Sequence, residues 1–203
     1  MKIHIIRHAE SIANIQHILA GQQDFPLSKK GQEDARLLAA RYLSHHNPSQ
    51  IYCSPLVRAR QTASPFLDSS NRILLIDRRL IEQDIGIFSG KTYEEAEADP
   101  RYEKNRTKRW QWTPPGGESY ESMAKRISSF FSSIPTEGPS CLIVTHAITM
   151  RIIRGLLEHT LPIYPETIAQ NGEIWEVSYR GLGVCHHIES LFFEDLDYTA
   201  HRD

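Results

Sequence analysis

Three short apolar runs in this 203-residue chain each end in residues that can do chemistry. The first run ends in Arg7-His8, the second in Ser54, and the third in Thr145-His146. Apolar runs of this length are typical of buried strands. In open α/β sheets, functional groups gather beyond the carboxyl ends of such strands. We therefore expect these polar residues to converge at one edge of a sheet.

Helical patterns alternate with the apolar runs over the first three-quarters of the chain. Strands and helices in alternation predict a mostly parallel sheet with helices on both faces. The expected fold is an α/β fold, built as a three-layer α/β/α sandwich. The strands expected for it cover residues 2–6, 50–53, 73–76 and 141–144, and capping side chains predict helices that begin at Ser28, Ser54, Thr92 and Ser119, with a further helix over 148–158.

The last quarter of the chain predicts a β-hairpin. Residues 174–179 and 184–188 flank a glycine-containing turn, and together they would add an antiparallel edge to the sheet. We expect residues 1–196 to form a single domain, followed by a frayed polar tail over 197–203.

Composition argues against several classes of protein. A formal net charge of −2 gives no sign of nucleic-acid binding. Cys53, Cys141 and Cys185 have no Cys-x-x-Cys spacing, so neither a disulfide framework nor a zinc knuckle is indicated. No stretch approaches the roughly 18 apolar residues of a membrane span, and the first apolar run is too short for a signal peptide. We therefore expect a cytoplasmic protein without nucleic-acid or membrane partners.

Two pairs of adjacent histidines, His45-His46 and His186-His187, suggest metal binding only superficially. Neither pair has a third partner at the spacing of metal ligands. We expect no metal site from either pair.

Several motifs, in this order along the chain, resemble those of the histidine phosphatase superfamily. They are Arg7-His8-Ala9-Glu10, the ten residues from Ser54 to Ala63, Glu82, and Val144-Thr145-His146. Supporting matches are Asn14, the stretch from Gly21 to Gly31, and Gly116-Gly117-Glu118-Ser119. The chain resembles the branch that includes cofactor-dependent phosphoglycerate mutases and small-molecule phosphatases, which implies a phosphoglycerate mutase-like fold.

The resemblance also implies a role for each motif residue. His8 would be the nucleophile that forms a phosphohistidine, and Glu82 would protonate the leaving group. Arg7, Arg58 and His146, the last as imidazolium or as neutral donor, would stabilise the phosphoryl oxygens, so no metal and no cofactor is expected. Contacts to the substrate are expected from Arg7, Asn14, Gly21, Gln22, Arg58, His146 and Ala147.

Each assignment has an alternative. A histidine such as His8, taken alone, is more often structural than catalytic. Glu10 and Asp84 are carboxylates near Glu82 in the sequence, and either could replace it as the acid. We expect the highest activity at mildly acidic to neutral pH, because a carboxylic acid must carry its proton to act.

The chain departs from the family beside both histidines. The family usually has glycine after each of them, whereas this chain has Ala9 and Ala147. Alanine indicates a negative φ at both positions and would add two methyl groups near the phosphate.

A basic run occupies part of residues 99–118. One interpretation of this run is a solvated face, and the other is a flap over the active site that selects polyanionic or aromatic substrates. The residues concerned are Arg101, Lys104, Arg106, Lys108, Arg109, Trp110 and Trp112.

We expect a metal-independent phosphatase that hydrolyses phosphomonoesters of small metabolites. The mutases of this branch carry a longer insert with an Arg-Arg pair and a run of prolines. Arg78-Arg79 and Pro114-Pro115 are present here, but the extended pattern is absent. A mutase-like phosphotransferase and a non-catalytic phospho-ligand module are the alternatives, and the oligomeric state stays open between a monomer and a homodimer.

Overall fold

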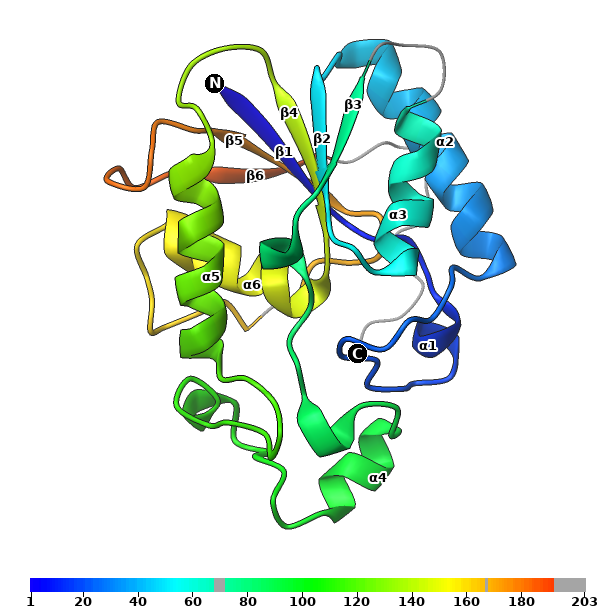
Figure 1. Ribbon diagram of the computed structural model, residues 1–203, viewed down its shortest axis with the longest axis vertical. Coiled ribbons are helices and arrows are strands. Elements are labelled where there is room, and N and C mark those ends of the chain that lie inside the picture. The colour runs from blue at the N-terminus through cyan, green and yellow to red at the C-terminus, as the bar shows by residue number, and fades with distance from the viewer. Residues whose placement is uncertain (68–71, 167, 192–203) are drawn as a thin grey trace.

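The computed structural model describes residues 1–67, 72–166 and 168–191. Its strands form one sheet in the order β3-β2-β4-β1-β5-β6 (Figure 1). The predicted, mostly parallel sheet is confirmed. The parallel strands are β1 (Lys2–Arg7), β2 (Gln50–Cys53), β3 (Ile73–Ile76) and β4 (Cys141–Thr145), and the antiparallel edge consists of β5 (Ile174–Ser178) and β6 (Ile188–Leu191).

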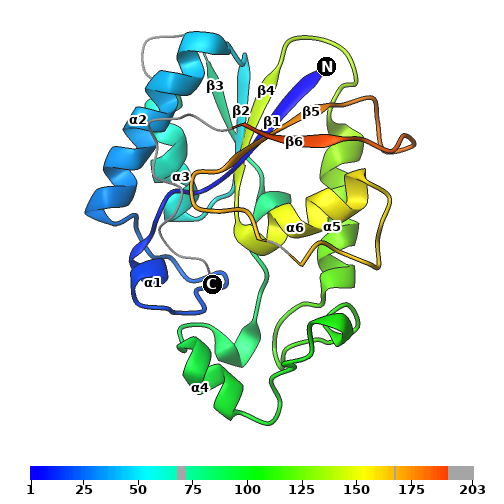
Figure 2. The ribbon, with the colours of Figure 1, turned by 180° about the vertical axis from the view of Figure 1, so that it is seen from behind.

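Helices cover both faces of this sheet (Figures 1 and 2). The helices α2 (Lys29–His45) and α3 (Val57–Ala63) cover one face, while α5 (Tyr120–Ser133) and α6 (Ala147–Leu157) cover the other. The three-layer sandwich is therefore confirmed. Among the helices of the described ranges, none has the length and apolar character needed to cross a membrane.

Successive residues of β1 face different layers, because side chains alternate along a strand. Ile3 and Ile5 pack in the core under α5 and α6, whereas Ile6 packs in the core under α2. Cys53 and Cys141 are also buried in these cores, as predicted. The cores on both faces of the sheet are thus apolar, and Arg7 and Thr145 lie at the carboxyl ends of β1 and β4.

One predicted cap is wrong. Ser28 and Ser119 accept backbone N–H bonds at the starts of α2 and α5, as expected. The helix predicted from Ser54 instead begins at Val57, without a side-chain cap. The reason is that the Ser54 hydroxyl lies 2.6 Å from a ring nitrogen of His146.

The predicted hairpin is present with a later second strand. The prediction placed that strand at 184–188, whereas β6 begins at Ile188, which pairs with Val177. The residues before it pack on the end of α6 instead, since His186 N–H donates to Leu157 O at 2.8 Å. The predicted tail over 197–203 lies outside the described residues.

An excursion between β3 and α5 lies beyond the carboxyl ends of the parallel strands (Figure 1). The capping box predicted at Thr92 is present and starts α4. The short elements at this end of the sheet are α1 (Ile12–Ile15), η2 (Arg78–Leu80), η3 (Gly86–Phe88), α4 (Tyr93–Ala98) and η4 (Arg106–Lys108), while η1 (Ser64–Phe66) ends α3 at Pro65.

Candidate active site

His8 stands one residue past the end of β1, and its backbone holds it there. Its N–H donates to the Thr145 carbonyl of β4 at 2.9 Å, which extends the β1–β4 pairing to His8. Its Nδ1 lies 2.7 Å from the Ala9 carbonyl oxygen. A carbonyl can only accept a hydrogen bond, so Nδ1 carries the proton and Nε2 carries the lone pair.

The surroundings of His8 keep its ring neutral. Only 5% of the residue is exposed. Burial, and then the positive charges of Arg58 and Arg7, lower the pKa of His8 well below its usual value. A neutral imidazole with its lone pair on Nε2 is the nucleophilic form.

Arg58 is buried and is held by two carbonyl groups. Its Nη1 donates to Gln23 O and its Nη2 to Gly21 O, both at 2.8 Å. Gly21 has a φ of +50°, which favours glycine there. Burial lowers the pKa of Arg58 to about 10, while Glu82 and Asp24 oppose that shift, so the side chain stays charged at neutral pH. The structure therefore brings together two residues predicted for the site, Gly21 and Arg58.

Arg7 precedes His8 at the end of β1. Its Nη1 donates to the Ala169 carbonyl at 2.7 Å. Its charge contributes to the lowered pKa of both His8 and His146, so it lies within electrostatic reach of both rings. Arg7 and Arg58 supply two fixed positive charges beside His8.

His146 lies opposite His8, with the two ring centroids 5.2 Å apart. Its Nε2 lies 2.6 Å from Ser54 Oγ, while its buried Nδ1 has no hydrogen-bond partner among the described residues. Burial is the main cause that lowers the pKa of His146 well below its usual value, and the charge of Arg58 adds to it. Of the two predicted forms, the structure favours the neutral donor over the imidazolium.

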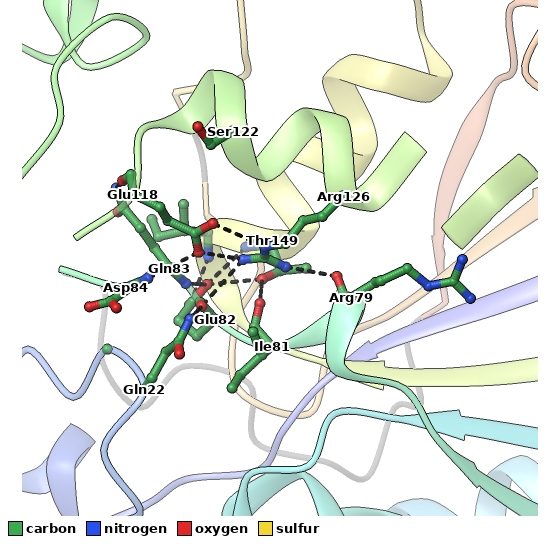
Figure 3. A network of polar contacts seen from close by, with 12 residues as sticks. Gln22, Arg79, Ile81, Glu82, Gln83, Asp84, Glu118, Ser122, Arg126 and Thr149 are labelled. Atoms are coloured by element: carbon green, nitrogen blue, oxygen red, sulfur yellow. Dashed lines mark hydrogen bonds and ion pairs between the residues drawn. The ribbon is translucent and has the colours of Figure 1, made fainter. Parts of the chain in front are cut away.

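Glu82 caps the helix that follows His146 (Figure 3). Its Oε2 accepts the Ile148 N–H at 3.0 Å, and its Oε1 accepts the Thr149 N–H at 3.0 Å. Oε1 also accepts from the Thr149 hydroxyl and from Gln83 N–H, each at 3.0 Å. The first N–H groups of a helix lack partners within the helix, and His146 provides no side-chain cap for α6. The same hydrogen bonds therefore cap α6 and hold in place the carboxylate of Glu82, which is the candidate acid.

Arg126 of α5 binds the backbone carbonyl groups of Arg79 and Glu82 (Figure 3). Its Nη1 donates to Arg79 O at 2.7 Å and its Nη2 to Glu82 O at 3.3 Å. The same guanidinium forms a bidentate pair with Glu118, at 2.8 and 3.1 Å. Glu118 in turn accepts the Asp84 N–H at 3.1 Å. The result is a polar clamp, Arg126 with Glu118, behind Glu82.

Two further residues predicted for the site, Gln22 and Asn14, lie near Glu82 and His8. Gln22 Nε2 donates to Glu82 O at 3.0 Å. Asn14 Oδ1 accepts the Ser11 N–H at 3.0 Å in the capping box of α1. Asn171 Nδ2 donates to His8 O at 2.9 Å and lies 3.4 Å from Asn14 Oδ1, which places Asn14 beside His8.

The two alanines have the predicted backbone conformation. Among the described non-glycine residues, positive φ occurs at His17 and His159, so Ala9 and Ala147 have the negative φ that was predicted. The Ala9 methyl group packs in a small buried cluster with Leu27 and Ala35. Ala147 is the first residue of α6.

The competing carboxylates have other partners. Glu10 Oε1 lies 2.5 Å from Ser28 Oγ, at the start of α2. Asp84 Oδ1 accepts the Gly86 N–H at 2.9 Å in a tight turn. Glu82 is the one of the three whose carboxylate binds the first turn of α6.

Sequence reasoning missed Arg126, Thr149 and Gln83. Arg126 lies within the amphipathic helix α5, where a polar residue carries no signal of its own. Thr149 is the third residue of α6, and only knowledge that a distant carboxylate caps that helix would have singled it out.

The basic run folds onto an aromatic cluster. The Arg109 guanidinium lies 4.9 Å from the ring centroid of Tyr102 and 6.0 Å from that of Trp112. Tyr102 and Trp112 also pack on Phe88.

A surface hollow of about 550 Å³ lies beside Trp110 and α5, away from His8. The candidate active site is therefore identified by the chemistry of its side chains and not by the volume of a hollow.

Comparison with known proteins identifies the family. The family model of the histidine phosphatase superfamily (branch 1) matches residues 3–186. Phosphoserine phosphatase 1 of Hydrogenobacter thermophilus is 32% identical over 158 residues, which cover 74% of this chain and 73% of that protein. A 2,3-bisphosphoglycerate-dependent phosphoglycerate mutase 2 of Gloeobacter violaceus is 30% identical over 176 residues, 81% of this chain and 78% of the mutase. Among solved structures, Bacillus stearothermophilus YhfR matches with a TM-score of 0.77 and 26% identity, over 87% of this chain and 90% of that one. The predicted family is thus confirmed: the chain belongs to the histidine phosphatase superfamily (branch 1).

Proposed function

We propose that the protein is a metal-independent phosphatase, which hydrolyses phosphomonoesters of small metabolites through a phosphohistidine on His8. The observation that carries this proposal is the 2.7 Å contact between His8 Nδ1 and the Ala9 carbonyl. It leaves the lone pair on Nε2, beside two arginines and a second imidazole. Phosphoryl transfer requires mainly positioning and electrostatic stabilisation of this kind.

The reaction proceeds in two displacements. His8 Nε2 attacks phosphorus, the N–P bond forms, and the ester P–O bond breaks as Glu82 gives its proton to the departing alkoxide. Water then attacks the phosphohistidine, Glu82 takes back a proton, and inorganic phosphate leaves with His8 regenerated. Arg7 and Arg58 hold the phosphoryl oxygens during both steps.

Ser54 bears on the tautomer of His146. Its hydroxyl oxygen accepts the Leu56 N–H at 3.4 Å and lies 2.6 Å from His146 Nε2. A hydroxyl can donate or accept, and we assign it here as the donor to Nε2. The ring proton then lies on Nδ1, the buried nitrogen with no partner among the described residues. Nδ1–H donates to a phosphoryl oxygen when substrate binds.

The contacts of Glu82 differ between its two oxygens. Oε1 accepts three hydrogen bonds, whereas Oε2 accepts from Ile148 N–H alone among the described residues. Oε2 therefore has room for the proton that the leaving group receives.

A mutase-like phosphotransferase is the second candidate, supported by the similarity to the Gloeobacter violaceus mutase. One feature favours the phosphatase. Arg79, part of the Arg-Arg pair, donates to Asp77 at 2.6 Å and to Ser129 O at 2.9 Å, so it braces α5. A mutase needs extra anion ligands to hold a bisphosphorylated intermediate, and Arg79 already has other partners.

The test is a panel of phosphomonoesters, with phosphoserine included because a relative is named for it. We expect phosphate release that resists chelators and an acid-labile phosphoenzyme, both lost in His8→Ala. His187→Ala, which removes an exposed histidine, is the matched control. Undiminished turnover in His8→Ala would overturn the proposal, and isomerised product that depends on 2,3-bisphosphoglycerate would establish the mutase instead.

A further inference from the structure

Two imidazoles and a carboxylate meet beside β1, at a distance from the candidate active site. His4 faces Glu176 across the β1–β5 pair, and His4 Nε2 lies 2.9 Å from Glu176 Oε2. His46, the residue after α2, brings its ring centroid to 4.6 Å from that of His4. One ligand atom from each residue lies within 4.8 Å of the other two. The fold thus provides the partners that the sequence alone did not show for the His45-His46 pair.

We propose that His4, His46 and Glu176 bind one divalent transition-metal ion, with zinc as the representative. Two imidazoles and a carboxylate are a ligand set that zinc accepts, with water in the fourth position. Bonds of about 2.0–2.2 Å at tetrahedral angles place neighbouring ligand atoms roughly 3.3–3.6 Å apart around one ion. His4 Nε2 and Glu176 Oε2 are 2.9 Å apart, so an ion between them requires only a small outward shift, and the half-buried His46 closes the site by turning its ring.

Tyr42 orients both histidines of this cluster. Its buried hydroxyl lies 2.8 Å from His4 Nδ1. Glu176 can only accept, so Nε2 of the ion-free His4 carries the ring proton and Tyr42 donates to Nδ1; with an ion on Nε2, the ring proton would lie on Nδ1 and Tyr42 would accept it. Histidines that bind metals commonly donate their second nitrogen in this way. The Tyr42 ring also stacks on His46, with centroids 4.8 Å apart and planes 24° apart.

Lys2 is the charged group that opposes an ion here. Its Nζ donates to Glu176 Oε1 at 2.6 Å, so it binds the carboxylate oxygen that does not face His4. Its side chain is 57% exposed and can swing into solvent. Removal of this ammonium should therefore tighten metal binding, whereas removal of a ligand should weaken it.

The cluster is separate from the nucleophile. His4 precedes His8 by four residues of extended chain, or roughly 13 Å at the rise of a strand. An ion at His4 would join the end of α2 to β1 and β5, and would stabilise the folded state by mass action.

The test uses the whole protein after dialysis against a chelator, with zinc chloride as the probe in calorimetric titration and thermal unfolding. We expect one ion per chain and a higher Tm in its presence. His46→Ala and Glu176→Gln should weaken binding at least tenfold, and Lys2→Gln should strengthen it. His45→Ala removes the adjacent exposed histidine and should bind zinc as the wild type does.

Two outcomes would overturn this site. One is zinc binding that is lost in His8→Ala but retained in His46→Ala, which would place the ion between His8 and His146. The other is equal affinity in His45→Ala and His46→Ala. Hydrolysis of p-nitrophenyl phosphate by His46→Ala should equal that of the wild type with or without chelator, so the metal site can fail independently of the proposed phosphatase.

Discussion

His146 Nε2 and Ser54 Oγ lie 2.6 Å apart, although 92 positions separate the two residues in the sequence. The contact follows from the sheet, because Ser54 directly follows β2, His146 directly follows β4, and Cys53 pairs with Val144 near the ends of these strands. Ser54 N–H also donates to Val144 O at 3.0 Å, which continues the pairing to Ser54. The register of two neighbouring strands thus brings Nε2 of His146 to the Ser54 hydroxyl.

Ser54→Ala should slow catalysis without unfolding the protein. The loss of one hydrogen bond that selects the His146 tautomer is worth up to about 1.5 kcal/mol, or roughly tenfold in kcat. KM should change little, because Ser54 touches His146 and not the substrate. Steady-state kinetics of Ser54→Ala against Ser132→Ala, an exposed serine of α5, would measure the effect. Equal kcat in the two variants would contradict the role of Ser54.

Glu82→Gln should lose activity by roughly 100-fold or more, as expected for a missing general acid. The loss should be smaller for p-nitrophenyl phosphate than for an alkyl phosphate, because p-nitrophenolate leaves without a proton. Glu82→Ala should in addition lower the free energy of unfolding by about 1–2 kcal/mol, because the cap of α6 is lost. Kinetics and urea unfolding separate the two effects. Equal losses for both leaving groups would exclude Glu82 as the proton donor.

Stability should fall as the pH drops below neutrality. The pKa values of His8 and His146 are well below their usual value in the folded state, whereas an unfolded histidine titrates near pH 6.5. Below that pH the unfolded chain binds more protons than the folded chain, so each histidine removes about 1.4 kcal/mol of stability per pH unit. The loss continues until the pH reaches the folded-state pKa. Chemical denaturation at pH 7 and pH 5 should show a smaller difference for His146→Asn than for the wild type; an unchanged difference would contradict the assignment.

The polar clamp, Arg126 with Glu118, should act on kcat through the position of Glu82. Arg126→Met and Glu118→Gln should each reduce kcat several-fold, and the double variant should be little worse than either. A double-mutant cycle on stability should give a coupling of about 0.5–3 kcal/mol, as for residues in one network. Additive effects on both kcat and stability would show that the two residues act separately.

The exposed charges of the basic run should matter only if residues 99–118 act as a flap. Replacement of Lys104, Arg106 and Lys108 by Gln should then raise KM several-fold for bisphosphorylated substrates and leave monoanionic ones unchanged. Arg109 is left in place, because it stacks on Tyr102 and Trp112. The same KM across a substrate panel would establish the solvated face.

Much of the site could be predicted because its residues sit in local motifs at strand ends. His8, Arg58 and His146 follow apolar runs that fold as predicted, so their convergence required only the parallel sheet. Ser54 was assigned wrongly as a helix cap, since a serine before a proline offers the same local signal whether or not a histidine lies on the neighbouring strand. Its true partner depends on strand order, which no local pattern contains.

Other contacts could not be predicted because they involve backbone groups of distant segments. Arg126 binds the carbonyls of residues 79 and 82, and every residue offers such a carbonyl. The start of β6 was misplaced because the preceding residues pack on the end of α6, a contact that depends on tertiary structure. His4 and Glu176 are 172 positions apart and meet only through the β1–β5 register.

The central position of β4 has a consequence for the order in which the protein can be assembled. β4 lies between β1 and β2, so these two strands make no pair with each other. A ribosome that has released only the residues before Cys141 has therefore exposed His8, which follows β1, and Arg58, which lies in α3 after β2, while no strand joins β1 to β2. When β4 inserts, it brings His146 and α6, and with α6 the helix that Glu82 caps. Catalytic competence should then arise in a single late step, which makes the onset of phosphatase activity a direct reporter of the closure of the sheet during synthesis.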